Sequence, residues 1–201
     1  MAKVAAIILA AGLSRRMGAK NKLLLPVRGR PMIAGVVGEY LGAAEDVRVV
    51  TGHEAERVGQ ALADLPVKLV HNPDFESGQP SSVAAGLRSL DGQDLVLVGL
   101  GDQVDLRSRH IEALLKAHFA HGGRKISVPH SAANRGNPIV IPGAMVAQIL
   151  DDGRNPGCGR FTRENPDLVE KIAFEDPAYF TDVDTPEAYR ALSPQIAEAR
   201  A

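Results

Sequence analysis

The chain is poor in several features on which whole classes of protein depend. Its single cysteine, Cys158, forms no internal disulfide, which is typical of a reducing compartment. It has no tryptophan and only 4% aromatic residues, too few for the stacking platforms that bind single-stranded nucleic acid. The formal net charge of −1 gives no overall basic field, so we expect no nucleic-acid partner.

Long apolar runs are also missing. Gly12 and Arg15 interrupt the first hydrophobic stretch, so we expect neither a membrane span nor a secretory signal. The sequence therefore predicts a cytoplasmic protein with no membrane partner.

What remains is an ordinary globular composition, 45% hydrophobic and 23% charged over 201 residues, and we expect residues 1–201 to form a single domain. Strand and helix patterns alternate along it. Strands are predicted at 4–9, 47–50, 67–70, 94–100, 125–128, 139–141 and 168–174. Helices are predicted at 31–42, 54–63, 81–90, 107–120, 142–151, 158–164 and from Pro186. This order predicts an α/β fold with a mostly parallel sheet, helices on both faces, and a ligand site at the carboxyl ends of the strands.

The loop after the first predicted strand is rich in small residues and cations. Ala10, Ala11 and Gly12 let a ligand approach the backbone, and Arg15, Arg16, Lys20 and Lys22 follow within a few residues. A backbone cradle with cations is what the phosphates of a nucleotide require. The spacing fits neither G-x-x-x-x-G-K-[ST] nor G-x-G-x-x-G, however, and a solvated basic loop explains the same residues.

Two acidic segments are candidates for metal binding. Asp102 follows the most strand-like run in the chain, where carboxylates commonly hold Mg²⁺ on substrate phosphates, although a turn aspartate is also common there. Asp182 and Asp184 precede Thr185 and Pro186, which suit the N-cap and first position of a helix. A helix start at Thr185 and Pro186 does not explain why two aspartates precede it.

Two further polar segments have ordinary structural explanations. Ser81 stands where a helix N-cap is expected, and Asn134 to Pro138 has the composition of a turn. His53, His71 and His130 lack metal-ligand spacing with one another or with Cys158.

The loop itself carries a longer pattern. Leu9-Ala10-Ala11-Gly12-x-Ser14-x-Arg16-Met17-Gly18, followed by Lys22-Leu23-Leu24-x-Pro26, resembles the signature loop of the MobA-like nucleotidyltransferases. It is most similar to the branch that contains molybdenum cofactor cytidylyltransferase. The resemblance implies a Rossmann-like sheet of the nucleotide-diphospho-sugar transferase type. It also implies that Arg16 and Lys22 bind the triphosphate, while the backbone of Leu9, Ala10, Ala11 and Gly12 faces the nucleotide. Ala11 stands where the guanylyltransferase branch usually has glycine, which favours a cytidine nucleotide.

The same resemblance implies roles for residues elsewhere in the chain. Asp102 and Asp184 would share Mg²⁺, with Gly101 clearing space beside the nucleotide. Ser82 would bind cytosine, beside a pocket wall at Gly78 and Gln79. Arg135 and Asn137 would contact the second substrate. The stretch from Asn155 to Phe161 lacks an aspartate that many members carry, which leaves the acceptor open.

The resemblance implies transfer of CMP from CTP to a phosphate monoester, by analogy molybdopterin, with release of pyrophosphate. Arg16, Lys22 and Asp102 would be the catalytic residues and Mg²⁺ the cofactor. A molybdenum hydroxylase is a possible recipient of the product. Two alternatives stay open: a guanylyl- or cytidylyltransferase for another phosphorylated acceptor, and a non-catalytic nucleotide- or cofactor-binding chaperone for a molybdoenzyme.

Overall fold

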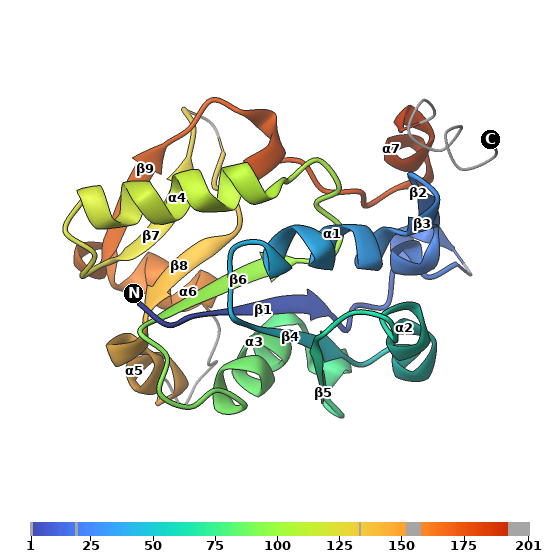
Figure 1. Cartoon of the computed structure of the whole chain (residues 1–201), viewed down its shortest axis with the longest axis horizontal. Coiled ribbons are helices and arrows are strands. Elements are labelled where there is room, and N and C mark those ends of the chain that lie inside the picture. The colour runs from blue at the N-terminus through green and yellow to red at the C-terminus, as the bar shows by residue number, and fades with distance from the viewer. Residues whose placement is uncertain (1, 19, 133, 152–157, 193–201) are drawn as a thin grey trace.

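A seven-stranded sheet forms the centre of the protein (Figure 1). The computed structural model describes residues 2–18, 20–132, 134–151 and 158–192. The strand order is β5-β4-β1-β6-β8-β7-β9. The strands are β1 (Val4–Ala10), β4 (Asp46–Thr51), β5 (Lys68–His71), β6 (Leu95–Leu100), β7 (Ile126–His130), β8 (Ile139–Pro142) and β9 (Val169–Ala173).

The connections between these strands explain why the sheet is mostly parallel. Helices link β1, β4, β5 and β6, so these four strands run in the same direction. Only β8 runs against its neighbours β6 and β7 among the strands of this sheet that the structure describes. The predicted α/β class with a mostly parallel sheet is confirmed.

Helices cover both faces of the sheet, as predicted (Figure 1). In β1, Ala6 and Ile8 face the core shared with one helix layer, while Ile7 faces the core on the other side. The first layer contains α1 (Met32–Leu41), α2 (Ala55–Ala61), α4 (Ser108–Ala120) and α7 (Pro186–Ala191). The second contains α3 (Gln79–Arg88), α5 (Val146–Leu150) and α6 (Cys158–Glu164).

A small hairpin of β2 (Pro26–Val27) and β3 (Arg30–Pro31) was not predicted. Its strands are too short to show an alternating pattern, and each contains a proline that weakens a strand prediction. The hairpin lies next to α7, because the Tyr189 hydroxyl donates a hydrogen bond to the Pro26 carbonyl at 2.8 Å.

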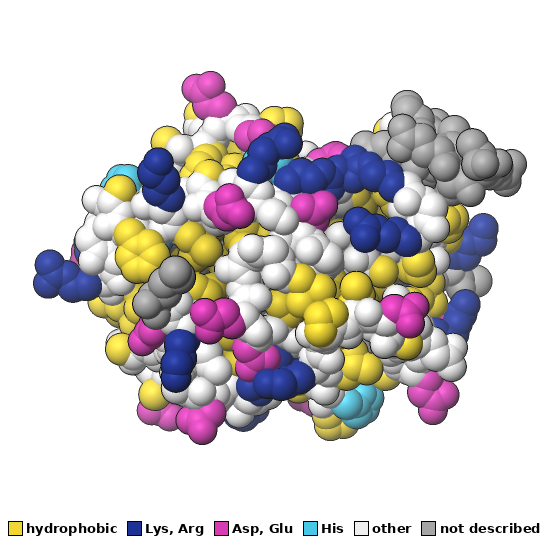
Figure 2. Space-filling model, viewed as in Figure 1, with side chains coloured by type: hydrophobic (Ala, Val, Ile, Leu, Met, Phe, Trp, Pro, Cys, Tyr) yellow, Lys and Arg dark blue, Asp and Glu magenta, His cyan; other side chains and the backbone are white. Residues whose placement is uncertain are grey.

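The surface carries both signs of charge. Figure 2 shows Lys and Arg side chains interspersed with Asp and Glu on the face viewed, in keeping with a net charge of −1. Among the described helices, none combines the length and apolar character needed to cross a membrane.

Candidate nucleotide-binding site

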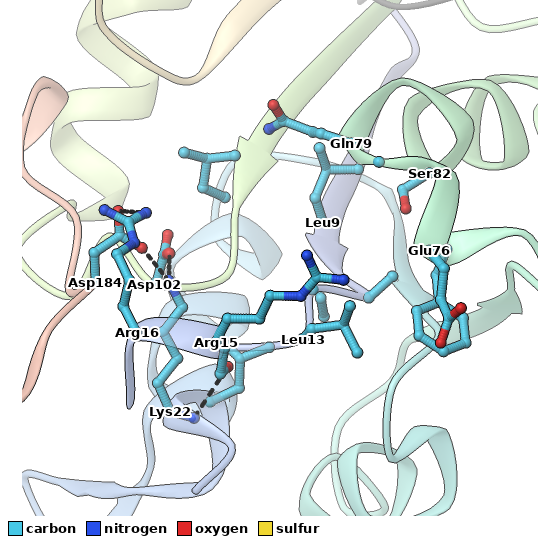
Figure 3. Close-up of a pocket in the computed structure, with 18 residues that line it drawn as sticks. Leu9, Leu13, Arg15, Arg16, Lys22, Glu76, Gln79, Ser82, Asp102 and Asp184 are labelled. Atoms are coloured by element: carbon cyan, nitrogen blue, oxygen red, sulfur yellow. Dashed lines mark hydrogen bonds and ion pairs between the residues drawn. The ribbon is translucent and has the colours of Figure 1, made fainter. Parts of the chain in front are cut away.

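A cavity of about 450 Å³ opens where β1 and β6 end (Figure 3). The first strand's loop, the start of α3, the end of β6 and the segment before α7 all contribute to it. Its lining comprises Leu9, Ala10, Ala11, Gly12, Leu13, Ser14, Arg15, Arg16, Lys22, Leu23, Phe75, Glu76, Gly78, Gln79, Ser82, Leu100, Asp102 and Asp184. The cavity thus lies at the carboxyl ends of the strands, the edge at which sheets of this class bind their ligands.

The loop after β1 is held by its own backbone and by short 3₁₀ turns. Ser14 adopts a left-handed conformation with φ 49°, and its hydroxyl accepts a hydrogen bond from the Lys22 backbone N–H at 3.3 Å. Asn21 caps the next turn by accepting from the Leu23 N–H at 3.1 Å. Met17, within the loop, is buried. These contacts direct the Arg16 and Lys22 side chains to the same end of the cavity (Figure 3).

Gly12 is the open point of this loop. A Cβ built at Gly12 meets no atom within 4 Å, although the residue lines the cavity. The backbone there is open to the cavity, and its predicted role as a phosphate cradle stays a prediction.

Asp102 is placed by the adjacent strands. Gly101 N–H donates to the Leu9 carbonyl at 3.1 Å, so the chain leaves β6 beside the start of the β1 loop. The Asp102 carbonyl then accepts from the Val183 N–H at 3.1 Å, and Val183 is buried in the core. Asp182 and Asp184 flank Val183 in the sequence. Because Val183 is anchored in this way, both aspartates lie beside Asp102, although Asp102 is distant from them in the sequence.

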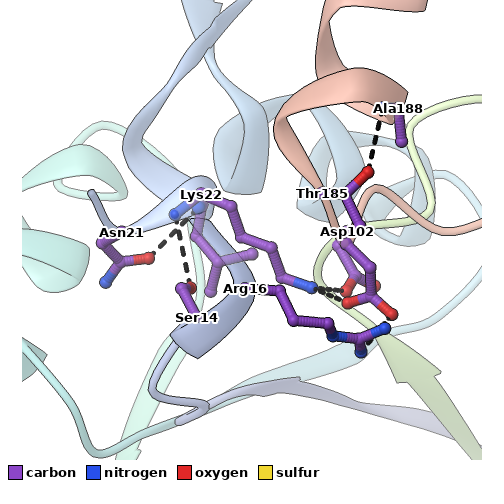
Figure 4. Close-up of polar contacts among 9 residues, drawn as sticks. Ser14, Arg16, Asn21, Lys22, Asp102, Thr185 and Ala188 are labelled. Carbon is purple, nitrogen blue, oxygen red and sulfur yellow. Dashed lines mark hydrogen bonds and ion pairs between the residues drawn. The ribbon is translucent and has the colours of Figure 1, made fainter. Parts of the chain in front are cut away.

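A compact ion-pair network results (Figure 4). The Lys22 ammonium donates to the Asp102 carboxylate and, at 2.7 Å, to Asp184 Oδ1. The Arg16 guanidinium donates to Asp184 Oδ2 at 2.5 Å. Lys22 and Asp102 are largely buried, with side-chain exposures of 13% and 12%, whereas Arg16 is 68% exposed. The structure therefore brings together the two cations and the two carboxylates that were nominated from distant parts of the sequence.

Burial and charge shift the pKa values of this network in different directions. Burial raises the pKa of Asp102 above its usual value, and the neighbouring Lys22 offsets this only in part. Burial also acts upward on the pKa of Asp184, but Lys22 and Arg16 together hold it below its usual value. The two carboxylates outweigh the effect of burial on Lys22, so its pKa is raised and it stays protonated.

The acidic residues fit a divalent cation. Single carboxylate oxygens of Asp102, Asp182 and Asp184 lie within 4.8 Å of one another. Asp102 Oδ1 is buried and has no hydrogen-bond partner among the described residues, so a coordination position is available. Oxygen ligands of this kind suit Mg²⁺ or Mn²⁺. Asp182, ranked behind Asp184 from the sequence, belongs to the same cluster.

Ser82 lies across the cavity from the ion pairs, between Leu9 and Glu76 (Figure 3). The expectation that Ser81 caps this helix is wrong. α3 begins at Gln79, Gly78 occupies the N-cap position with φ 112°, and Pro80 stands in the first turn. The Ser81 hydroxyl instead donates to the carbonyl of Asp74 or Gly78, both at 2.8 Å. Gly78 and Gln79 line the cavity, as the predicted wall requires.

Other nominated residues lie outside the described lining of this cavity. The Arg135 guanidinium donates to Thr162 Oγ1 at 2.7 Å, and Asn137 N–H donates to the Tyr179 carbonyl at 2.8 Å. Their acceptor-binding role stays a prediction. Gly101 is buried, and a Cβ there would lie 2.7 Å from Ile33 Cδ1, so its direct surroundings are protein atoms.

Of the remaining sequence predictions near the site, one is confirmed and one lies partly outside the described residues. Thr185 caps α7 as predicted, accepting from the Ala188 N–H at 3.2 Å. The variant stretch from Asn155 to Phe161 falls partly outside the described residues, which resume at Cys158.

Leu13, Phe75 and Glu76 line the cavity but were not nominated from the sequence. Leu13 lies inside the signature loop at a position that the pattern leaves free. Phe75 and Glu76 belong to a 3₁₀ turn (Phe75–Ser77) between β5 and α3, where no periodic pattern marks them.

An α/β sheet with a glycine-lined loop, cations and clustered carboxylates at its carboxyl edge defines a nucleotide-binding protein of the nucleotidyltransferase class. The chain belongs to the family of the MobA-like NTP transferase domain, which matches residues 6–168. The predicted family is thereby confirmed.

Among curated proteins, nicotine blue oxidoreductase of Paenarthrobacter nicotinovorans is 33% identical over 198 residues, covering 94% of this chain and 96% of that protein. The bifunctional protein GlmU of Halorhodospira halophila is 31% identical over 207 residues. That match covers 100% of this chain but only 43% of GlmU, so the chain spans less than half of that relative.

Solved structures share the fold. A nucleotidyl transferase from Methanothermobacter superposes with a TM-score of 0.80 at 23% identity, covering 98% of each chain. CMP:2-keto-3-deoxy-manno-octonic acid synthetase, solved with CTP, gives 0.72 at 16% identity, covering 98% of this chain and 99% of that one. Rv0371c of Mycobacterium tuberculosis, solved with manganese, gives 0.74 at 20% identity, covering 94% and 97%. These likenesses confirm the nucleotide-diphospho-sugar transferase type of fold.

Proposed function

We propose that this protein transfers CMP from CTP to the phosphate monoester of a pterin-type acceptor, molybdopterin or the molybdenum cofactor, with Mg²⁺ as its metal. Membership of the MobA-like family supports nucleotidyl transfer. The fold shared with a synthetase solved with CTP supports a cytidine nucleotide, as does Ala11 in the signature loop. The acceptor rests on the resemblance of that loop to the molybdenum cofactor cytidylyltransferase branch.

One observation carries the proposal. Lys22 contacts two carboxylates at the end of the cavity, and Arg16 contacts one of them. Cations and acidic oxygens so close together match a triphosphate with its metal ion, because each phosphate oxygen then finds a positive partner. A purely structural ion pair would not require a glycine-lined opening beside it.

The proposed reaction is a single in-line displacement. An oxygen of the acceptor phosphate attacks the α-phosphorus of CTP. The bond from the α-phosphorus to the oxygen bridging to the β-phosphorus breaks, and the β- and γ-phosphates leave as pyrophosphate. No covalent enzyme intermediate is required.

The residues contribute positioning and charge. Asp102 and Asp184, with Asp182 beside them, would hold Mg²⁺, which supplies polarisation of the phosphoryl oxygens when bound. Lys22 and Arg16 would turn from the carboxylates toward the β- and γ-phosphates and stabilise the charge of the leaving group. The Gly12 backbone would allow the phosphates to approach the loop closely.

The direct test is pyrophosphate release from CTP in the presence of the acceptor. Lys22→Ala and Asp102→Ala should each lower turnover by about a hundredfold or more, since each removes a preorganised transition-state contact. Lys20→Ala is the matched control, because Lys20 is an exposed cation of the same segment outside the cavity lining. Near-normal turnover in either test variant would refute the assignment.

A second candidate comes from the relative named nicotine blue oxidoreductase, at 33% identity over nearly the whole chain. A redox reaction would change the absorbance of a dye substrate without releasing pyrophosphate. A chaperone that only binds nucleotide or cofactor would give neither signal. Pyrophosphate release and dye absorbance, measured side by side, therefore separate the three functions.

A further inference from the structure

Arg15 lines the cavity, but the proposed chemistry gives it no role. The other two cations of the lining, Arg16 and Lys22, both form ion pairs with carboxylates. The Arg15 side chain is exposed, and within the part of the chain that the structure describes its guanidinium has neither an ion pair nor a hydrogen bond. Its positive charge is therefore available to a ligand that enters the cavity.

A tight turn directs Arg15 and its two neighbours to different places. Ser14 has φ 49°, and its carbonyl accepts a hydrogen bond from the Met17 N–H at 2.8 Å, which closes one 3₁₀ turn. Since such a turn has three residues per revolution, consecutive side chains point about 120° apart. Met17 is buried, and Arg16 contacts Asp184. Arg15 extends away from that contact, toward the opposite wall of the cavity (Figure 3).

The ion-pair network at the end of the cavity offers little net positive charge. The charges of Lys22 and Arg16 are matched by those of Asp102 and Asp184, and Asp182 adds a further carboxylate to the same end. A nucleoside triphosphate carries several negative charges, so this network gives it no net attraction until the ion pairs open. The unpaired guanidinium in the cavity lining is the positive charge that it meets first.

We propose that CTP binds in two steps. Its triphosphate first forms an encounter complex with Arg15, and Lys22 and Arg16 then exchange their carboxylate partners for the phosphates. An exposed guanidinium suits the first step, because its N–H groups match phosphate oxygens and are not engaged elsewhere. The second step is slower, since it breaks a largely buried ion pair between Lys22 and Asp102. This inference rests on the proposed function and supplies the order in which its residues meet the nucleotide.

The test is stopped-flow fluorescence on the full chain with Mg²⁺. The probe is CTP that carries a fluorescent methylanthraniloyl group on its ribose, and unlabelled CTP competes with it as the control for specific binding. Two-step binding predicts an observed rate that rises with probe concentration and then levels off at the rate of ion-pair exchange. A rate that rises linearly over the whole range would overturn the two-step order.

Arg15→Gln is the main variant, because it removes the charge and keeps a long polar side chain. At about 0.01 M salt, the probe concentration that gives half the plateau rate should rise by about tenfold. The plateau rate itself should stay within about twofold, because the ion pairs of the second step are intact. The difference from the wild type should shrink at about 0.15 M salt, where the screening length falls from about 30 Å to about 8 Å. A disturbed loop would instead change the plateau rate and give an effect that is independent of salt.

Two further variants complete the test. Arg15→Lys should restore most of the lost half-saturation, because it returns the positive charge. Lys171→Gln makes the same change of net charge at an exposed position on β9 outside the cavity lining, and it should behave as the wild type. Wild-type half-saturation and salt dependence in Arg15→Gln, in a chain that still releases pyrophosphate from CTP, would overturn this inference alone. A wild type that does not bind CTP would overturn it together with the proposed function.

Discussion

At the scale of the residue, Lys22 forms ion pairs with two carboxylates that a bound metal ion would also need as ligands. Its ammonium contacts both Asp102 and Asp184, the same carboxylates that cluster with Asp182 as candidate metal ligands. A cation in that position opposes the approach of a second cation until the triphosphate draws Lys22 away. Metal and nucleotide should accordingly bind together.

This arrangement predicts that a variant expected to lose turnover binds the metal ion more tightly. Lys22→Ala should bind Mn²⁺ about tenfold more tightly than the wild type in the absence of nucleotide, because the competing charge is gone. Electron paramagnetic resonance of free Mn²⁺ measures this directly. Lys20→Ala should leave the affinity unchanged, and weaker Mn²⁺ binding by Lys22→Ala would contradict the account.

Gly12 gives a second prediction at this scale. A Cβ there meets no protein atom within 4 Å, so Gly12→Ala should leave the melting temperature nearly unchanged. The methyl group would instead enter the part of the cavity where we propose that the phosphates bind. The affinity for CTP should therefore fall by about tenfold. Thermal melting and calorimetry on the same variant test the two halves separately. A large loss of stability would show that Gly12 serves the fold.

At the scale of the element, Gly101 is tightly surrounded by protein atoms, in contrast to Gly12. A Cβ at Gly101 would lie 2.7 Å from Ile33 Cδ1 on α1 and 3.1 Å from the Leu9 carbonyl oxygen on β1. Gly101→Ala should therefore destabilise the protein by about 1–3 kcal/mol, the usual cost of overpacking. Denaturant unfolding provides the measurement, and an unchanged midpoint would contradict the close packing of Gly101 against Ile33 of α1.

The pairing of α4 with β7 predicts a dependence of stability on pH. His118 on α4 is buried, its ring Nδ1 lies 2.8 Å from Ser127 Oγ on β7, and burial lowers its pKa below 6.5. A histidine with a lowered folded-state pKa favours the unfolded state when it protonates. Its contribution to stability is thus complete above 6.5 and is lost as the pH falls through the folded-state pKa.

The melting temperature of the wild type should consequently fall between about pH 8 and about pH 5, and that of His118→Gln should fall less. His121→Gln is the matched control at the end of the same helix, where the side chain is exposed. Equal pH slopes for the wild type and His118→Gln would remove His118 as the cause.

Local sequence patterns were sufficient to place Asp102, because an uninterrupted apolar strand has a well-defined end and acidic residues there face the ligand edge. They ranked Asp184 ahead of Asp182 and did not predict that both would lie in one cluster with Asp102. Both lie there because Val183, between them, is buried and its backbone N–H donates to the Asp102 carbonyl. Tertiary contacts of this kind leave no periodic signal in the sequence.

At the start of α3, by contrast, the prediction from local sequence was wrong. Serine before a helical run predicts an N-cap, but Gly78 with φ 112° and Pro80 start the helix two residues before Ser81. Ser81 and Ser82 instead accept hydrogen bonds from the Asn72 amide, about ten residues away, a contact that only the folded structure reveals.

At the scale of the whole molecule, sheet, loop and closing segment converge on one edge. The loop after β1 supplies Arg16 and Lys22, the turn after β6 supplies Asp102, and the segment before α7 supplies Asp182 and Asp184. Three distant parts of the chain thus assemble one charged end of a single cavity. The account depends on that end binding a metal–triphosphate.

The most direct measurement is pyrophosphate release by the full chain with Mg²⁺ and a phosphorylated pterin acceptor, using CTP, GTP, ATP and UTP in turn and identifying the adduct by mass spectrometry. The account predicts pyrophosphate with CTP, an adduct heavier by one CMP unit, and loss of both in Asp184→Asn. Release of no pyrophosphate from any of the four nucleotides, or full activity in Asp184→Asn, would contradict it.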